Sequence, residues 1–430
     1  MIKLNKLTQF LVDGILDKPK LILNEGGAYG HLAHPYEDME LTFQDIRNMV
    51  DQALLGDLKA FEKTDGQQLS FTWKDGQLRL ARNKGHLKNQ GQNALTKDSI
   101  KVMFSDKPQN IQDAFGFAVE DLSNALSKVP QEELNQMFGN GKKFASVEVI
   151  YPATKNVIPY NLSMLVFHGI IEYNDLGEPI AGGDAESGVI LGNLIKSVNS
   201  DVQNTFTIRG PNKLLLSKVK NLPLKRKQFM LMVDQLQGSF SDQTQIIEYH
   251  KNWWNNFIRE KADSFGYAIS SEVLNLLVKR WAEFDKSVSI KNILKQINNE
   301  EFKNFVSTFD KENHEQQYKN NIRPFEEIFL KLGVEVLKNA AGYMASSPDD
   351  AAKQIANDVL IQAKSIKSKG ATPDQLNKLK NELQRLKVIG GLKKIVGSEG
   401  LTFYYNNKIY KLTGLFAPVN QILGLLKYQR

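Results

Sequence analysis

The chain has 430 residues, of which 41% are apolar and 24% charged, and its formal net charge is +7. A chain of this length usually folds as roughly two or three domains, and the composition is that of an ordinary globular protein rather than a disordered one. The absence of cysteine excludes disulfides, thiolate metal sites and cysteine nucleophiles.

The sequence contains no recognisable membrane or export signal. No apolar run approaches the length of a membrane span. The N-terminal stretch, which Gly14 and Pro19 interrupt, lacks the continuous apolar core and the cleavage site of a signal peptide. We therefore expect a cytoplasmic protein without a membrane partner. We also expect a monomer. The positive net charge is compatible with a polyanionic partner.

The first half of the chain alternates between helical and strand-like segments. Residues 1–60 read as helices joined by a loop rich in glycine and histidine, and the last of these helices ends at Gly56. Alternating runs around a Lys-Asp-Gly turn predict a hairpin over 61–85. Helical spacing follows over 98–138, and β-branched and aromatic runs predict strands over 143–173. The glycine-rich stretch 177–188 is predicted to be a loop.

The pattern changes after residue 210. Residues 211–390 are rich in Lys, Glu, Asn, Gln and Leu at helical spacing, which predicts an all-helical domain. The last residues, 391–430, are strand-like again. We therefore predict an α+β fold of antiparallel sheets formed by 61–210 and 391–430, with 1–60 as its helical and loop extension and 211–390 as an inserted domain.

The tetrapeptide Lys63-Thr64-Asp65-Gly66 raises the possibility that Lys63 is a nucleophile. The usual pKa of lysine is about 10.4, so about one side chain in a thousand is neutral at pH 7.4, which adds roughly 4 kcal/mol to a barrier. Desolvation or nearby cations have to lower that pKa, and Arg82 and Lys411 are candidate cations that also suit phosphate oxygens. By itself, the tetrapeptide is more typical of an exposed lysine beside a turn.

Further motifs follow in a fixed order at residues 80–85, 146–151, 165–170, 398–403 and 409–414. Together with the tetrapeptide, they resemble the motifs of the covalent nucleotidyltransferase superfamily, which contains ATP-dependent DNA ligases, RNA ligases and mRNA capping enzymes. The resemblance covers roughly 61–175 and 395–415. Within the superfamily, the chain is similar to RNA-ligase-like or phage-type ligases.

The resemblance implies ATP as the nucleotide and Mg²⁺ or Mn²⁺ as the metal. It implies that Lys63 takes AMP covalently and that Lys411 contacts the α-phosphate. Glu148 is expected to bind the ribose, Phe167 to face the adenine ring, and Glu399 to lie near both the metal and the α-phosphate. Nucleotide contacts are also implied at Glu62, Asp65, Gly66 and Arg82.

The implied reaction transfers AMP from the lysine to a 5′-phosphate end of a nucleic acid, which is then sealed to a 3′-hydroxyl. The short stretch after residue 414 leaves no room for the C-terminal OB-fold of DNA ligases and capping enzymes, which favours an RNA-ligase-like protein. Thr413 stands where ligases usually have a second lysine, with Lys408 as a candidate to compensate, and His168 stands where they often have Asp.

Several alternatives stay open. The chain is compatible with a DNA nick-sealing ligase, with a catalytically weak nucleotide-binding protein of the same fold, and with an AMP transferase that uses another acceptor. Residues 211–229 contain six Lys or Arg and no acidic residue. Lys225, Arg226 and Lys227 are therefore candidate nucleic-acid contacts, or else part of a solvated helix face.

Two other groups of residues have more than one interpretation. The loop containing His31, His34, Glu37 and Asp38 is compatible with a metal site, but a capping loop before a helix, near the nucleotide, fits better. The aromatic residues of the helical region are predicted to lie in its core rather than to stack on bases.

Overall fold

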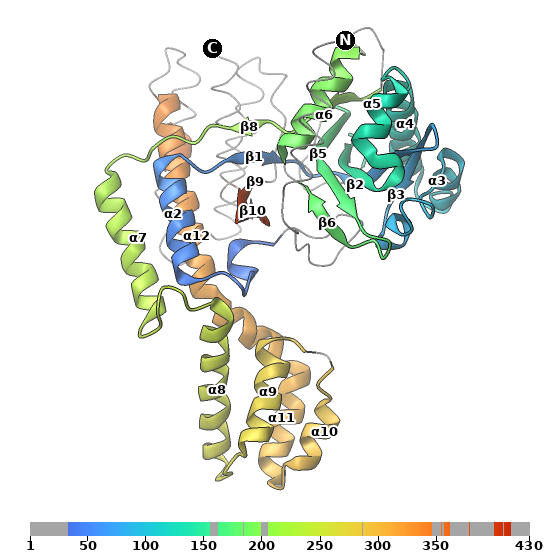
Figure 1. Cartoon of the computed structure of the whole chain (residues 1–430). Coiled ribbons are helices and arrows are strands. Elements are labelled where there is room, and N and C mark those ends of the chain that lie inside the picture. The colour runs from blue at the N-terminus through green and yellow to red at the C-terminus, as the bar shows by residue number, and fades with distance from the viewer. Residues whose placement is uncertain are drawn as a thin grey trace.

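The computed structural model describes residues 33–154, 162–183, 185–198, 205–285, 287–345, 354, 357–361, 378, 400–406 and 408–413. It is an α+β fold in which almost all strand pairs are antiparallel, as predicted. Two sheets lie side by side, each covered by its own helices, and a helical arm extends away from both (Figure 1).

The first sheet joins strands that are far apart in the sequence. Its order is β10-β9-β1-β8. The strands are β1 (Ala60–Lys63), β8 (Lys213–Leu214), β9 (Gly400–Tyr405) and β10 (Lys408–Thr413). The chain between β8 and β9 contains α7 to α12, so it leaves this sheet for the arm and then returns. Strand β8 lies inside the region predicted to be all-helical.

The second sheet is built mainly from consecutive strands. Its order is β3-β2-β4-β5-β6, and β7 pairs in parallel with the start of β5. The strands are β2 (Gln67–Lys74), β3 (Gln77–Ala81), β4 (Lys143–Ile150), β5 (Met164–Tyr173), β6 (Pro179–Gly182) and β7 (Thr207–Arg209).

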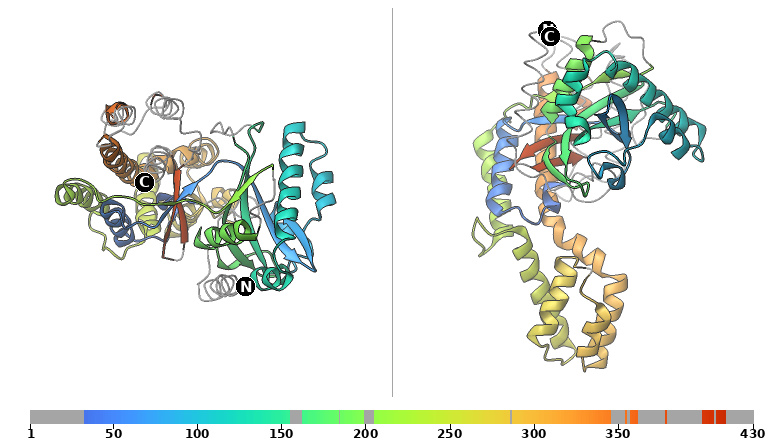
Figure 2. Two further views of the ribbon diagram at one scale, coloured as in Figure 1. Left: turned by 90° about the horizontal axis from the view of Figure 1, so that it is seen from above. Right: turned by 45° about the vertical axis from the view of Figure 1, so that its right-hand side comes forward.

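Helices cover one face of each sheet (Figure 2). The first sheet shares an apolar core with α2 (Phe43–Leu55), α7 (Leu222–Gln237) and α12 (His314–Ala345). The second shares one with α4 (Gln109–Leu126), α5 (Gln131–Phe138) and α6 (Ala185–Val198), and α3 (Lys97–Met103) packs on α4. Three short 3₁₀ helices are η1 (Pro35–Glu37), η2 (Lys84–Leu87) and η3 (Gly139–Gly141).

The local sequence accounts for several of these elements. Thr42 caps α2 through a reciprocal pair of hydrogen bonds with Asp45, and the helix ends at Gly56, whose φ is 82°. The β2–β3 hairpin turns at Asp75 and Gly76, with φ values of 51° and 71°. Positive φ at both positions is what a tight two-residue hairpin requires, so the predicted turn is confirmed.

The arm consists of α8 (Ile246–Ser264), α9 (Ser271–Ala282), α10 (Ile290–Gln296) and α11 (Glu300–Glu312), with the start of α12. Trp254 and Trp281 are completely buried in its core, and Trp253 stacks on Phe257 with ring centroids 5.2 Å apart. The prediction that these aromatic residues form a core is therefore confirmed, and burial of their large rings stabilises the bundle.

One prediction of local structure is wrong, and others lie outside the described residues. The stretch predicted as a loop, 177–188, instead contains β6 and the first turns of α6. Gly188 lets the start of α6 pack closely on β5, because a Cβ atom there would lie 2.8 Å from the carbonyl oxygen of Phe167. The expected N-terminal helix and the helices expected over 347–390 lie outside the described residues, apart from a few positions. None of the helices that are described combines the length and the apolar character of a membrane span.

Candidate functional site

Lys63 and Lys411 lie on the same face of the first sheet. Lys63 pairs with Gly400, which pairs with Thr413, while Lys411 pairs with Thr402, two residues along β9 from Gly400. Directly paired residues and residues two apart share a face of a sheet. The opposite face carries the residues that form the core with α2 and α12. The two lysines expected at an α-phosphate are thus brought together from opposite ends of the chain.

The connection from β1 to β2 places Gly66, three residues after Lys63, against Glu148 of the second sheet. A Cβ atom at Gly66 would lie 2.8 Å from the carbonyl oxygen of Val149 and 3.0 Å from Oε2 of Glu148. Only glycine fits such a close approach without a shift of the backbone. Oε1 of Glu148 lies 3.5 Å from Nε2 of His168, and Oε2 is buried without a hydrogen-bond partner among the described atoms. A buried carboxylate oxygen of this kind suits a hydroxyl donor from a ligand.

Arg82 lies close to the same carboxylate. Its guanidinium is 4.9 Å from the ring centroid of Phe115 and 5.7 Å from that of Phe104. Burial lowers the pKa of Arg82, and the negative charge of Glu148 opposes this shift. The guanidinium stays charged at neutral pH, because even a lowered arginine pKa lies far above it. The structure therefore brings together Arg82, Glu148 and Gly66, and Lys63 lies three residues before Gly66 in the chain.

Phe167 does not lie where a base could stack on it, so that prediction is wrong. Its side chain is fully buried in the core of the second sheet, with its ring centroid 5.6 Å from that of Phe71. A bulge causes this, because Ser146 pairs with Gly169 while the next residue, Val147, pairs with Phe167. The extra residue, His168, is the one that reaches Glu148.

The face that carries Glu148 offers aliphatic rather than aromatic side chains. Val166 pairs with Glu148, and Met164 pairs with Ile150. These three apolar side chains form a small buried cluster of their own. They are at most 2% exposed, so, like Phe167, they offer no surface to a base.

Glu62 is also placed differently from the prediction. Because side chains alternate along a strand, it lies on the opposite face of β1 from Lys63. Its Oε1 accepts from the backbone N–H of Asn212 at 2.8 Å, its Oε2 from the side-chain amide of Asn212 at 3.0 Å, and it forms an ion pair with Arg209. Arg209 belongs to β7 of the second sheet, so this buried network ties the two sheets together instead of contacting a nucleotide.

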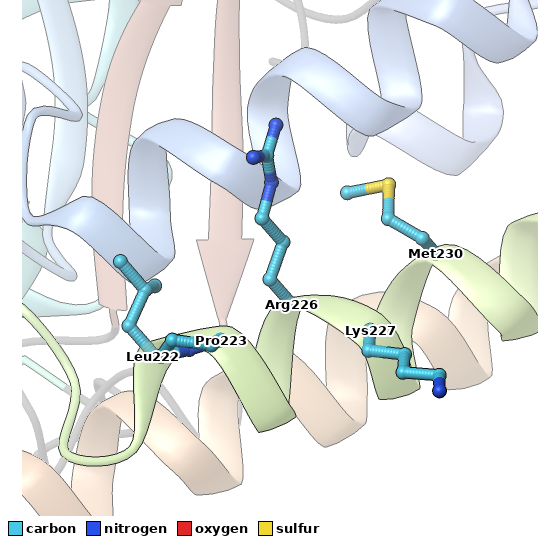
Figure 3. A pocket seen from close by; sticks show the side chains of 5 residues that line it. All are labelled: Leu222, Pro223, Arg226, Lys227 and Met230. Carbon is cyan, nitrogen blue, oxygen red and sulfur yellow. The ribbon is translucent and has the colours of Figure 1, made fainter.

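The predicted nucleic-acid contacts on α7 are largely committed to the protein itself. Arg226 makes a bidentate ion pair with Asp51 of α2, at 2.9 and 2.6 Å, and Lys225 pairs with Glu335 of α12 at 3.1 Å. Figure 3 shows Arg226 extending toward α2 while Lys227, which is exposed, extends away from it. Two of the three charges are therefore largely neutralised, which argues against this patch as a phosphate-binding surface.

Another lysine of the same basic stretch is better placed. Lys213 of β8 pairs with Phe61, so it lies on the face that carries Lys63, and its side chain is exposed. Sequence reasoning missed it because the charge of a basic run does not show which members face a site. Lys408, in contrast, lies on the other face of β10 from Lys411, with Nζ 2.8 Å from Asp38 and 2.6 Å from Glu40. It is therefore not a substitute for a second motif lysine.

A segment before α2 completes the site from the edge of the first sheet. Ala33 bridges Tyr410 in parallel, and its carbonyl oxygen accepts from the backbone N–H of Lys411 at 3.0 Å. This register places His34 beside Lys411. Its Nε2 lies 3.5 Å from Oγ1 of Thr413, and its ring stacks on Tyr36 with centroids 4.8 Å apart. The expected capping loop is confirmed, since Glu37 accepts from the backbone N–H of His34 at 2.7 Å.

The chain matches no protein-family model and no curated protein. Its function is therefore argued from the residues and their geometry.

Glu399 and Asp65 are the two remaining predicted site residues. Glu399 precedes β9 and lies outside the described residues, so the structure gives no position for the expected metal ligand. Asp65 lies in the short connection between Lys63 and Gly66 and is partly exposed. Within the described parts of the chain, no three His, Asp or Glu side chains form a group that would hold a metal ion.

Proposed function

We propose that this chain is an ATP-dependent polynucleotide ligase, with RNA as the favoured substrate, that acts through an AMP–lysine intermediate on Lys63. The observation that carries the proposal is the shared face of Lys63 and Lys411, with Gly66 packed against Glu148. Sequence order alone gave the motifs, whereas the sheet register brings together side chains that are far apart in the chain. In this proposal the two sheets form the adenylation domain and the helical arm is an insertion.

Each residue has a definite part in the proposed first step. The amine of Lys63 loses a proton and attacks the α-phosphorus of ATP, forming an N–P bond while the bond to pyrophosphate breaks. A second proton leaves the nitrogen, and the product is a phosphoramidate. Lys411 donates hydrogen bonds to the α-phosphate oxygens, whose charge grows as the reaction proceeds. Oε2 of Glu148 accepts from a ribose hydroxyl.

The later steps transfer AMP to the nucleic acid and then release it. An oxygen of the 5′-phosphate end attacks the phosphoramidate, so the N–P bond breaks and lysine recovers its protons. The 3′-hydroxyl then attacks the activated end, loses its proton, and AMP leaves. A Mg²⁺ or Mn²⁺ ion held by Glu399 would neutralise phosphate charge when bound. Lys213 is the described cation that best suits the nucleic-acid strand.

A labelling experiment tests the proposal directly. The protein is incubated with Mg²⁺ and ATP labelled at the α-phosphate, in parallel with ATP labelled at the γ-phosphate, and both samples are run on a denaturing gel. We expect a labelled protein band with the α label only, because pyrophosphate leaves with the γ label. The band should disappear after acid treatment, since a phosphoramidate is labile in acid. A protein that takes up neither label, with Mn²⁺ also tried, would instead favour a nucleotide-binding protein.

Replacing Lys411 with alanine should slow formation of the labelled band about 100- to 1,000-fold, because one preorganised donor to the phosphate is lost. Lys408→Ala is the matched control, since it removes the same charge from the same strand on the opposite face and should keep most of the rate. The rates are measured by quenching the labelling reaction over time. Equal losses in both variants would contradict a specific phosphate contact by Lys411.

The nucleic acid that accepts AMP needs its own test. Single-stranded RNA with a 5′-phosphate and nicked duplex DNA are offered in parallel to protein already carrying labelled AMP. Transfer to RNA alone is expected, and transfer to nicked DNA alone would favour the DNA-ligase alternative. The arm contains paired charges rather than a basic surface, including Lys251 with Glu283 and Arg280 with Asp310. It is therefore a weak candidate for binding long duplexes.

A further inference from the structure

His34 occupies a position from which it can reach a phosphate held by the two lysines. Its Nε2 lies 3.5 Å from Oγ1 of Thr413, and the backbone contact between Ala33 and Lys411 holds it at the edge of β10. The imidazole ring is mostly buried and is stacked on Tyr36, so its orientation is restricted. A restricted polar ring beside two lysines is arranged for a ligand rather than for solvent.

Thr413 lies directly across the sheet from Lys63, in the row that runs through Gly400. On β10 this row ends in a threonine hydroxyl, which offers one short donor and no charge. A site that binds a polyphosphate usually places several donors around each phosphate group. A threonine side chain is shorter than a lysine side chain, so its hydroxyl does not reach a phosphate that a lysine at this position would reach. A second donor to the phosphate therefore has to come from another element.

We propose that His34 is this donor: together with Lys63 and Lys411 it holds the α-phosphate of the nucleotide, in the place that Thr413 leaves without a cation. The inference deepens the proposed function and rests on it for the nature of the ligand. It assigns a substrate-binding role to the segment before α2, which approaches the site from the outer edge of the first sheet.

The electrostatics of the site are consistent with this role. Burial, followed by the charges of Lys411 and Lys63, lowers the pKa of His34 to about 4 against the opposing effect of a hydrogen bond to the backbone of Lys411, so the ring is neutral at pH 7. A neutral imidazole does not repel the lysines, and a ring that gains a proton beside a bound phosphate has two N–H donors, one for the backbone of Lys411 and one for the phosphate. A bound phosphate offsets the positive charge of both lysines, so the pKa of His34 should rise when the nucleotide binds.

The test measures binding separately from chemistry. The ligand is an ATP analogue with a methylene group between the α- and β-phosphates, which cannot transfer AMP, and adenosine is the control without phosphate. We expect His34→Ala to weaken binding of the analogue about 10- to 100-fold, as for loss of a hydrogen bond to a charged group, and to leave adenosine binding unchanged. His34→Gln, which keeps an N–H donor, should bind better than the alanine variant and serves if that variant fails to fold.

A second-site variant separates a phosphate contact from a structural role. Thr413→Lys, added to His34→Ala, places a cation where other ligases are expected to have one and should recover most of the lost affinity. No loss of affinity in His34→Ala, an equal loss for adenosine, or no recovery by Thr413→Lys would each overturn the inference.

The two proposals fail in different ways. If the unaltered protein binds the analogue through His34 but takes no α label from ATP, the ligase proposal fails and the phosphate contact stands. If it takes the label and His34→Ala binds the analogue normally, the ligase proposal stands and the contact is wrong. A protein that binds neither analogue nor ATP overturns both.

Discussion

Lys63→Ala should abolish the covalent labelling of the protein by α-labelled ATP. The other amines on this face of the described sheet are displaced from Lys63, so neither is expected to replace it. Lys213 lies on the neighbouring strand and Lys411 two strands away, both in the row of Phe61, and Thr413 carries only a hydroxyl. The loss should exceed that of any other single substitution, since it removes the atom that forms the new bond. Lys63 is partly exposed at the end of β1, so the free energy of unfolding should change by only about 0.5 kcal/mol.

Lys63→Arg is the matched control for charge. A guanidinium keeps the positive charge beside the phosphate but does not give up a proton at working pH, so it cannot serve as the nucleophile. This variant should bind the non-transferable analogue with near-normal affinity and still take no label. Persistent labelling of Lys63→Ala would show that AMP is attached elsewhere and would remove the basis of the proposed mechanism.

Glu62→Ala should lower the stability of the junction between the two sheets by about 3 kcal/mol, because it leaves the buried charge of Arg209 without its partner. The side chain of Glu62 is 4% exposed and that of Arg209 21% exposed, so solvent screens the pair only weakly. The same change removes both hydrogen bonds from Asn212. Urea unfolding measures the loss, and hydrogen exchange of β1 and β8 should locate it.

Asp51→Ala provides the comparison for this prediction. It also removes the carboxylate from an ion pair with an arginine, but the side chain of Arg226 is 61% exposed. Exposed pairs contribute little because solvent screens them, so this variant should be much more stable than Glu62→Ala. Similar losses in the two variants would mean that the Glu62 network does not hold the sheets together.

The local features of the fold could be predicted from the sequence. The turn at Asp75 and Gly76 and the end of α2 at Gly56 follow from residues that alone decide the backbone conformation. These predictions are confirmed because each depends on a short stretch of sequence. The motif order implied that Lys63 and Lys411 act at one phosphate; the structure places both on one face of the first sheet, two strands apart.

The direction of individual side chains could not be predicted in the same way. A one-residue bulge in β5 puts Phe167 into the core and His168 at the site, and no pattern of alternation shows where a bulge falls. The resemblance implies a nucleotide contact at Glu62, but Glu62 neighbours Lys63 on a strand, and neighbours on a strand face opposite ways.

Contacts between distant segments were also beyond the sequence. Arg209 lies far from Glu62 along the chain, and His34 lies far from Lys411, so no local spacing connects them. On α7 the sequence predicted a contact that the structure does not favour. Arg226 is a candidate phosphate contact from the sequence alone, but in the structure it forms an ion pair with Asp51. Charge runs give the number of cations but not their partners.

The pairing of β1 with β9 has a consequence for how the protein is made. Ala60 pairs with Phe403, so β1 leaves the ribosome long before its neighbour exists. At roughly 5–20 residues per second, the intervening chain takes roughly 20 to 70 seconds to synthesise. During that interval one edge of β1 is unpaired, which is a state prone to aggregation and in need of protection. The growing polypeptide therefore carries Lys63 in an unfinished sheet, and the proposed attachment of AMP would have to wait for the C-terminal strands.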